Sequence, residues 1–240
     1  MSLTFGAATT DRVDCGSAAG IDDTIQSALL WVRVTTLTGG RNFISKRRNA
    51  SADGWRFSLL GTAGDISYFH ETSLTNAEYN SNNTPVAVNV WTFVAATITR
   101  ATLVADIYAG TLSAPAAEVT YSAETAGTGT ATSDASRWLY IGNLDDATPA
   151  QALQGQIACA AVYSSVLTLA EIVDWQFNPR AGANCLGFWC FGFNGAGAQA
   201  DWTGSANDGT VNGATFSTQS PFGTFRKVQQ VRPVTFGMLR

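Results

Sequence analysis

Hydrophobic residues recur along the chain in short runs, many of them alternating with polar residues, and turn-forming residues separate the runs. Residues 55–60 (WRFSLL) show the alternation of a half-buried strand, and residues 25–34 (IQSALLWVRV) predict a long, strongly apolar one. The segment 86–100 contains a core strand over 91–98. The same pattern predicts further strands over 42–46, 65–70, 102–108, 138–142, 154–163 and 186–193, and a turn followed by a strand within 201–216.

One short helix interrupts this series of strands. Thr168 stands three residues before Glu171, which is the spacing of a capping box, and Pro179 ends the helix. The polar segments 72–85 and 123–136 predict long loops. Many short strands with a single helix indicate an all-β protein built as a two-sheet antiparallel sandwich. The sequence shows no internal repeat of about 20–50 residues, which argues against a propeller or a solenoid.

Composition agrees with one folded domain. Of 240 residues, 45% are hydrophobic and only 13% charged, which excludes a disordered chain. No stretch of about 18 uncharged apolar residues exists, so we expect no membrane span. We assign residues 1–216 to the sandwich domain and residues 217–240 to an extended C-terminal arm.

The formal charge of −4 is unevenly distributed along the chain. After Asp208 there is no acid, and four basic residues give that segment +4, so the rest of the chain carries −8. An acidic body does not suit nucleic acid, and we expect no nucleic-acid partner. The basic segment suits an acidic partner.

The beginning of the chain, MSLTFG, has neither a basic segment nor an apolar segment of a secretory leader. We therefore expect synthesis in a cytoplasm, with Cys15, Cys159, Cys185 and Cys190 as reduced, buried thiols. A bond between Cys185 and Cys190 stays open. Zinc has no support, because there is no C-x-x-C and only one histidine, His70.

The order of several short motifs resembles the laminin-G-like domains of the concanavalin-A-type jelly-roll fold. The motifs are residues 11–14 (DRVD), 28–33 (ALLWVR), 91–95 (WTFVA), 139–142 (LYIG) and 169–172 (LAEI). Residues 187–189 (GFW) with 201–211 are similar to a segment that usually lies at the front of such domains, so the order looks circularly permuted. The resemblance spans about residues 3–216 and implies a two-sheet jelly roll.

The same fold includes glycoside hydrolases, whose chemistry needs two facing carboxylates. On one strand these would read Glu-x-Asp-x-x-Glu, because alternate residues share a face, and no such string exists. No nucleophile elbow or phosphate-binding loop occurs either. We therefore expect no enzyme activity and no organic cofactor. The glutamates lie far apart, at Glu71, Glu78, Glu118, Glu124 and Glu171.

Calcium is the one cofactor that the resemblance suggests, because such domains often hold it at a loop rim. Carboxylate and amide oxygens suit the ion, and the candidates are Asn143, Asp145 and Asp146, with Asp201 or Asp208 from another loop. Ala158 and Cys159 stand where family members carry acids, which favours solvated loop acids instead.

A glycan site needs an aromatic platform beside hydrogen-bonding side chains. Trp31, Trp91 and Trp189 lie in core-strand patterns, whereas we expect Trp55, Trp138 and Trp202 to be exposed and available to sugars.

The arm is unusual for a free tail, because it mixes apolar and basic residues. Exposed apolar groups gain nothing from water, so we expect the arm to lie on its own domain, on a symmetry mate or on a larger assembly, as a partner-binding segment in the last two cases. Its candidate contact residues are Phe222, Phe225, Arg226, Lys227, Arg232, Phe236 and Leu239.

Two functions fit these features. The first hypothesis is a non-enzymatic bacteriophage virion protein, a capsid decoration or head-fibre protein on the virion surface, made in the host cytoplasm and homo-oligomeric, with a trimer as one option. Its partners would be capsid or other virion proteins. The alternative is a carbohydrate-binding or adhesion module, such as a tail or receptor-binding component.

Overall fold

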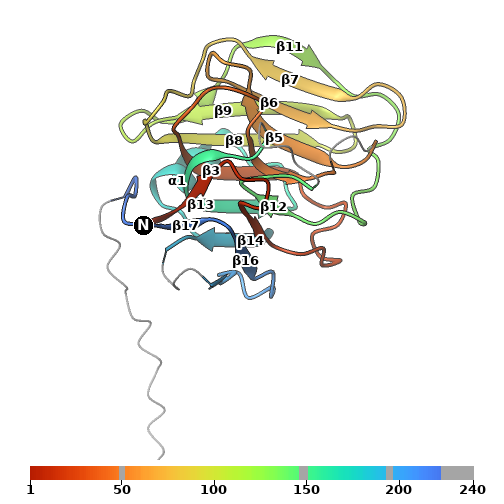
Figure 1. Cartoon of the computed structure of the whole chain (residues 1–240). Helices are drawn as coiled ribbons and strands as arrows, with labels where there is room; N and C mark the ends of the chain where they lie inside the picture. The colour runs from red at the N-terminus through yellow and green to blue at the C-terminus, as the bar shows by residue number, and fades with distance from the viewer. Residues whose placement is uncertain (49–51, 146–150, 193–196, 223–240) are drawn as a thin grey trace, which may run out of the picture.

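The computed structural model describes residues 1–48, 52–145, 151–192 and 197–222. These residues form two antiparallel sheets packed face to face, with one helix (Figure 1). The all-β sandwich with a single helix predicted from the sequence is therefore confirmed. In the described part of the chain, no helix has the length and apolar character needed to cross a membrane.

The first sheet contains eight strands, with β14 pairing to β13 beside the main path. In sheet order they are β10 (Ala117–Glu118), β9 (Val104–Gly110), β8 (Thr92–Thr99), β3 (Ser27–Val34), β13 (Gln154–Tyr163), β1 (Ser2–Gly6) and β17 (Thr215–Ser217), with β14 (Cys185–Cys190).

The second sheet contains nine strands. In sheet order they are β11 (Tyr121–Thr125), β7 (Ala77–Ser81), β6 (Asp65–His70), β5 (Trp55–Leu60), β4 (Asn42–Lys46), β12 (Tyr140–Ile141), β2 (Arg12–Asp14), β16 (Gly209–Asn212) and β15 (Ala198–Gln199).

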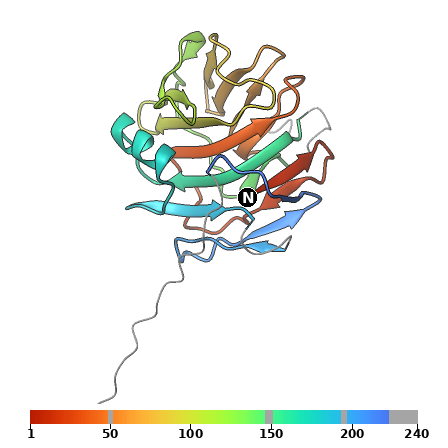
Figure 2. The same ribbon diagram turned by 90° about the vertical axis from the view of Figure 1, so that its left-hand side faces the viewer.

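The central strands β3, β8 and β13 of the first sheet are buried on both faces. Leu30 and Val32 of β3 point into the core between the sheets, whereas Leu29 and Trp31 point outward into a second apolar cluster. Helix α1 (Leu169–Phe177) covers this outer face (Figure 2). Burial on two sides explains why this strand is a continuous apolar run without polar alternation.

Local signals in the sequence fix the helix. The Thr168 side chain accepts from the Glu171 N–H, and the Glu171 carboxylate accepts from the Thr168 N–H, so the predicted capping box is confirmed. At its other end, the Trp31 indole donates to the Gln176 carbonyl at 3.0 Å. The helix is thereby tied to the sheet that it covers.

The predicted loop 72–85 is wrong in part, because it contains β7. The strand's one large apolar side chain, Tyr79, is buried in the core, while Glu78 and Asn80 face outward. The predicted loop 123–136 likewise begins inside β11, which pairs with β7. Neither strand has enough apolar residues to show a period of two. Pairing with a neighbouring strand, rather than local propensity, makes them strands.

The chain after the helix completes both sheets. Strand β14 pairs with β13, β16 with β2, and β17 with β1, where Ser217 lies opposite Ser2. The predicted arm therefore starts on the sandwich. Phe222 packs edge-on against Trp31 with ring centroids 5.4 Å apart, so it lies on its own domain, one of the surfaces expected for the arm. The remaining arm residues, Phe225, Arg226, Lys227, Arg232, Phe236 and Leu239, lie outside the described residues.

Candidate functional site

A groove of about 400 Å³ opens beside the end of the second sheet where β12, β2 and β16 lie next to one another. On β2 and β16, Val13 and Val211 point into the core, so their neighbours Asp14, Thr210 and Asn212 point outward. The groove is lined by Asp14, Cys15, Gly16, Ala18, Trp138, Ala206, Asn207, Asp208, Thr210 and Asn212.

Trp138 forms the aromatic wall of the groove and is 48% exposed. The next residue fixes its position: the Leu139 N–H donates to the Gly16 carbonyl at 2.8 Å, and the Leu139 carbonyl accepts from the Cys15 N–H at 2.9 Å. These two bonds hold the indole beside the segment that follows β2. Of the three tryptophans predicted to meet sugars, Trp138 is the one that lines the groove.

The other two tryptophans lie elsewhere. Trp55 is only 1% exposed and stacks on Tyr68 between the sheets, so the expectation that it is exposed is wrong. It shares the inward face of β5 with Phe57 and Leu59, which alternate with outward residues. Trp202 is 51% exposed on the loop between β15 and β16, but it does not line the groove. Its contact with glycans stays a prediction.

The loop 201–208 forms one wall of the groove through Ala206, Asn207 and Asp208, and Asp201 organises this loop. The Asp201 carboxylate accepts the backbone N–H groups of Phe188 (3.1 Å), Thr203 (3.0 Å) and Asn207 (3.3 Å). The Asn207 side chain donates to the Leu186 carbonyl at 2.8 Å. This wall is therefore tied to strand β14.

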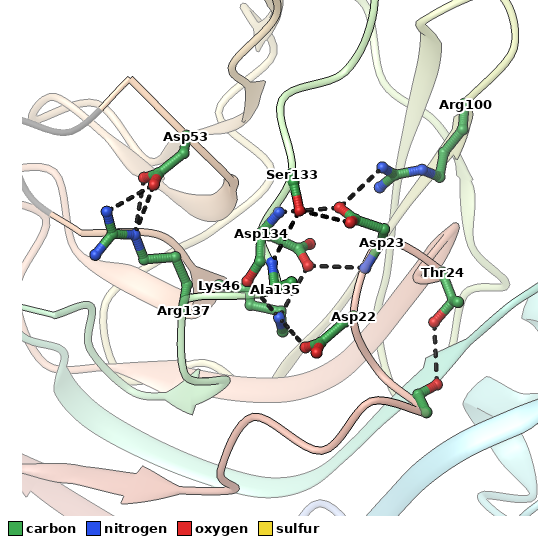
Figure 3. A network of polar contacts seen from close by, with 11 residues as sticks. Asp22, Asp23, Thr24, Lys46, Asp53, Arg100, Ser133, Asp134, Ala135 and Arg137 are labelled. Carbon is green, nitrogen blue, oxygen red and sulfur yellow. Dashed lines mark hydrogen bonds and ion pairs between the residues drawn. The ribbon is translucent and has the colours of Figure 1, made fainter.

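A buried ion cluster anchors the loop that carries Trp138 (Figure 3). The Lys46 and Asp134 side chains are both 0% exposed. The Lys46 ammonium donates to the Asp134 carboxylate (2.8 Å), to the Asp134 carbonyl (2.6 Å) and to the Asp22 carboxylate (2.6 Å). A buried charge is tolerated only when it is paired and hydrogen-bonded, as it is here.

Asp23 continues this cluster and ties two loops together. Its backbone N–H donates to the Asp134 carboxylate at 2.8 Å, and the Asp134 N–H donates back to the Asp23 carboxylate at 2.9 Å. Burial alone would raise the pKa of Asp23, but hydrogen bonds from Ser133 and Asp134 and the charges of Arg100 and Lys46 lower it below its ordinary value. Asp23 is thus held ionised.

Arg137 directly precedes Trp138, and its side chain and backbone hold this part of the loop in place. Its guanidinium makes a two-pronged contact with the Asp53 carboxylate, with Nε–Oδ2 at 2.8 Å and Nη2–Oδ2 at 2.6 Å (Figure 3). The Arg137 N–H also donates to the Asp134 carbonyl at 2.8 Å. The segment 133–137 is therefore pinned on both sides, which holds Trp138 outward.

Two carboxylates face the groove, from Asp14 and Asp208. Burial raises the pKa of Asp14, an effect that a hydrogen bond from the Gly16 N–H and the charge of Arg12 partly offset. The Asp208 carboxylate accepts the Asp201 N–H at 2.8 Å. An indole face beside carboxylate, amide and hydroxyl groups can stack on an apolar ring face and hydrogen-bond to hydroxyls around it.

Sequence reasoning missed Asp14, Thr210 and Asn212, and it considered Asp208 only for calcium. Asp14 lies on β2 and Asp208 immediately before β16. The pairing of these two strands, with Asp14 opposite Thr210, brings them into one groove. Carboxylates that meet through such long-range pairing lie far apart in the sequence, so a pattern along a single strand does not reveal them.

The candidate calcium residues Asn143 and Asp145 differ in their surroundings. Asn143 is fully buried, its amide donating to the Thr9 (3.0 Å) and Asp11 (3.2 Å) carbonyls and its Oδ1 accepting from the Leu144 N–H. These bonds occupy it as a structural residue. The backbone of Asp145 forms an isolated parallel β-bridge with that of Arg48, and Asp146 lies outside the described residues. Across the described ranges, no group of three or more His, Cys, Asp or Glu is arranged to hold a metal ion.

Comparisons with known proteins give the family and the fold. No curated protein is a detectable relative by sequence. A structure from Bacteroides ovatus, described as a candidate carbohydrate-binding protein, superposes with a TM-score of 0.60 at 15% identity over 89% of this chain, which spans 58% of that structure. A SAP-like pentraxin from Limulus polyphemus superposes with a TM-score of 0.52 at 8% identity over 72% of this chain and 80% of its own.

A laminin-G-type family profile matches residues 7–173 of the 240. This range contains strands β2 to β13 and the capping box of the helix, so the match covers most of both sheets. The resemblance read from the motifs is confirmed at the level of the family. The chain belongs to the Concanavalin A-like lectin/glucanases superfamily.

Proposed function

We propose that the protein is a carbohydrate-binding module that holds its ligand in the groove at Trp138. The observation that carries the proposal is a half-exposed indole, rigidly held, in a groove with Asp14, Asp208 and Asn212. The groove's volume, about 400 Å³, falls in the range of about 300–1,000 Å³ that is typical of small-ligand sites. The fold shared with the Bacteroides ovatus protein supports this function.

The lining also favours a class of sugar. The apolar face of a pyranose ring stacks on the Trp138 indole, while its hydroxyls donate to the carboxylates of Asp14 and Asp208 and pair with the amide of Asn212. Two carboxylates repel a ligand carboxylate or sulfate at short range. The preferred ligands are therefore neutral sugars or amino sugars rather than acidic glycans.

Binding without hydrolysis is the function we infer. The Asp208 carboxylate already holds the Asp201 N–H and so has a structural task in shaping the loop. A glycosidase needs one carboxylate as acid and another as base or nucleophile. Release of new reducing ends from a bound oligosaccharide would replace the binding function with a catalytic one.

The experiment is a glycan array followed by calorimetry with the best ligand. We expect the wild type to bind neutral or amino-sugar oligosaccharides and Trp138→Ala to lose at least about fivefold in affinity, since removing an aromatic contact that the ligand buries costs more than about 1 kcal/mol. Trp202→Ala is the matched control, because Trp202 is equally exposed but lies outside the groove lining. Equal affinity of wild type and Trp138→Ala, or binding of acidic glycans alone, would contradict the proposal.

A role as a bacteriophage capsid decoration or head-fibre protein stands as a second proposal. What supports it is the basic and apolar composition of residues 223–240, which continue from the anchor at Phe222. The comparisons favour carbohydrate binding over this role. Mass spectrometry of gradient-purified particles is the test: hundreds of copies of the chain per particle would establish it, and absence would rule it out. A homo-oligomer on the virion surface depends on the same result.

A further inference from the structure

Cys159 on β13 lies directly opposite Cys190 on β14. The preceding pair along these strands is hydrogen-bonded, because the Phe191 N–H donates to the Ala158 carbonyl at 2.9 Å. Hydrogen-bonded and non-hydrogen-bonded pairs alternate in an antiparallel ladder, so Cys159 and Cys190 form a non-hydrogen-bonded pair. At such positions the two Cα atoms approach to about 4.5 Å, within the range that a disulfide spans.

The side chains use this proximity. Both cysteines are free thiols, and their Sγ atoms lie 3.0 Å apart. Cys159 is almost fully buried in the apolar cluster under α1, whereas Cys190 is only half-buried. The pair thus joins a buried cysteine to a partly exposed one, and Cys190 is the member that a small reagent meets first.

The other two cysteines have no such partner. Cys185 and Cys190 are five residues apart on one strand, which separates them by about 16 Å at 3.3 Å per residue. A disulfide needs Cα atoms within about 7 Å, so the Cys185–Cys190 bond left open by the sequence is excluded. Cys15 lies in the core between the sheets, on the other side of the first sheet from Cys159.

We propose that Cys159 and Cys190 are a redox-active pair that closes to an intrachain disulfide between β13 and β14. The oxidant is a small disulfide such as oxidised glutathione. The Cys190 thiolate attacks one of its sulfurs and releases one glutathione thiolate. The Cys159 thiolate then attacks the Cys190 sulfur of the mixed disulfide and releases the second. Two protein thiols lose two protons and two electrons, and the oxidant becomes two thiols.

Burial governs the speed of the second step. It raises the pKa of the Cys159 thiol well above its ordinary value, so little of the reactive thiolate is present near neutral pH. Closure is therefore slow at pH 7 and faster at pH 8–9, while the first step at the half-buried Cys190 is less restricted.

The bond would act on the wall of the groove. Strand β14 pairs only with β13 among the described strands, and the loop 201–208 is hydrogen-bonded to β14. The Trp202 N–H donates to the Phe188 carbonyl (2.9 Å), and the Trp189 indole donates to the Asn207 carbonyl (2.8 Å). A disulfide at Cys190 therefore fixes the strand to which this loop is hydrogen-bonded. This effect does not depend on which ligand the groove binds.

The test uses the full-length protein, first reduced and then incubated with oxidised glutathione at pH 8.5. We expect an intact mass lower by two hydrogens, a Cys159–Cys190 cross-linked peptide, and a Tm higher by about 5–10 °C, because the link closes a loop of about 30 residues. The amides of residues 201–208 should exchange more slowly in the oxidised form.

Matched variants separate this pair from the other thiols. Cys185→Ala should oxidise like the wild type, whereas Cys159→Ala and Cys190→Ala should show neither the cross-link nor the Tm rise. Three results would overturn the proposal: four thiols that stay titratable, a glutathione adduct that persists on Cys190, or a cross-link that maps to another cysteine or to a second chain. None of these readouts depends on glycan binding.

Discussion

The loop 133–138 connects two regions that treat polar groups in opposite ways. At one end, Asp134 is fully buried and shares the Lys46 ammonium with Asp22. At the other end, Trp138 is half-exposed in a groove that Asp14 and Asp208 also line. The interior region satisfies its charges within the chain, whereas the groove leaves hydrogen-bonding groups open.

This difference shows how an apolar ring can be kept facing water. A free tryptophan on a loop would fold back onto apolar surface, because burial of its ring is favourable. Here the buried ion cluster and the Arg137–Asp53 contact fix the backbone before Trp138, and the bonds of Leu139 fix it after. The polar interior thus holds an exposed aromatic side chain in place, and disrupting the interior should damage the groove.

The largest effect is expected from removing the buried cation. Lys46→Met leaves Asp134 charged and buried without its partner, so we expect the free energy of unfolding to fall by about 3–5 kcal/mol. Urea unfolding at pH 7 measures it. Arg48→Met, at an exposed position two residues on, is the control and should change stability by less than about 1 kcal/mol. A Lys46→Met protein as stable as the control would show that the cluster does not hold the loop.

A smaller effect is expected from pH, through His70. Burial, together with the charge of Arg100, lowers the pKa of His70 to about 3. Between pH 6.5 and 3 the unfolded chain therefore binds a proton that the folded chain does not, and the free energy of unfolding falls by about 1.4 kcal/mol per pH unit, or about 2 kcal/mol from pH 6.5 to 5.

Urea unfolding at pH 7, 6 and 5 measures this slope. Because His70 is the chain's single histidine, His70→Gln should flatten the curve between pH 6.5 and 5. Parallel curves of the free energy of unfolding against pH for the two proteins would contradict a neutral, buried His70. The interior would then have no pH sensitivity that comes from this residue.

The smallest effect on stability is expected from a substitution at Arg137. Its effect on glycan binding in the groove should be larger. Arg137→Gln removes the two-pronged contact with the partly exposed Asp53 and should cost about 1 kcal/mol of stability. It should also weaken glycan binding severalfold, because the loop before Trp138 loses its clamp. Arg180→Gln breaks the exposed ion pair with Asp174, far from the groove lining, and should leave both quantities almost unchanged. Equal glycan affinities for the two variants would show that the clamp has no part in positioning.

Much of the fold follows from local patterns. The alternation in β5, the apolar run of β3 and the capping box at Thr168 each mark their element within a few residues. The short strands β7 and β11 are missed because pairing, not composition, defines them.

The site is harder to predict, because it depends on contacts between distant segments. Trp138 is correctly chosen as an exposed aromatic, yet Asp14 and Asp208 join it only through the pairing of β2 with β12 and β16. The error at Trp55 has the opposite cause. Its own strand alternation places it beside Phe57 on the inward face, and that local signal should have outweighed its position after a hairpin turn.

The most direct test of the account follows individual tryptophans during binding. The chain, labelled with 5-fluorotryptophan, would be titrated with soluble gluco-, xylo- and chito-oligosaccharides and observed by fluorine NMR, each signal assigned by a Trp→Phe variant. We predict that the Trp138 signal shifts with a saturable dependence on one of these ligands while that of the buried Trp55 stays in place. A ligand-dependent shift at other tryptophans with Trp138 unmoved, or no shift with any ligand that the glycan array identifies, would contradict it.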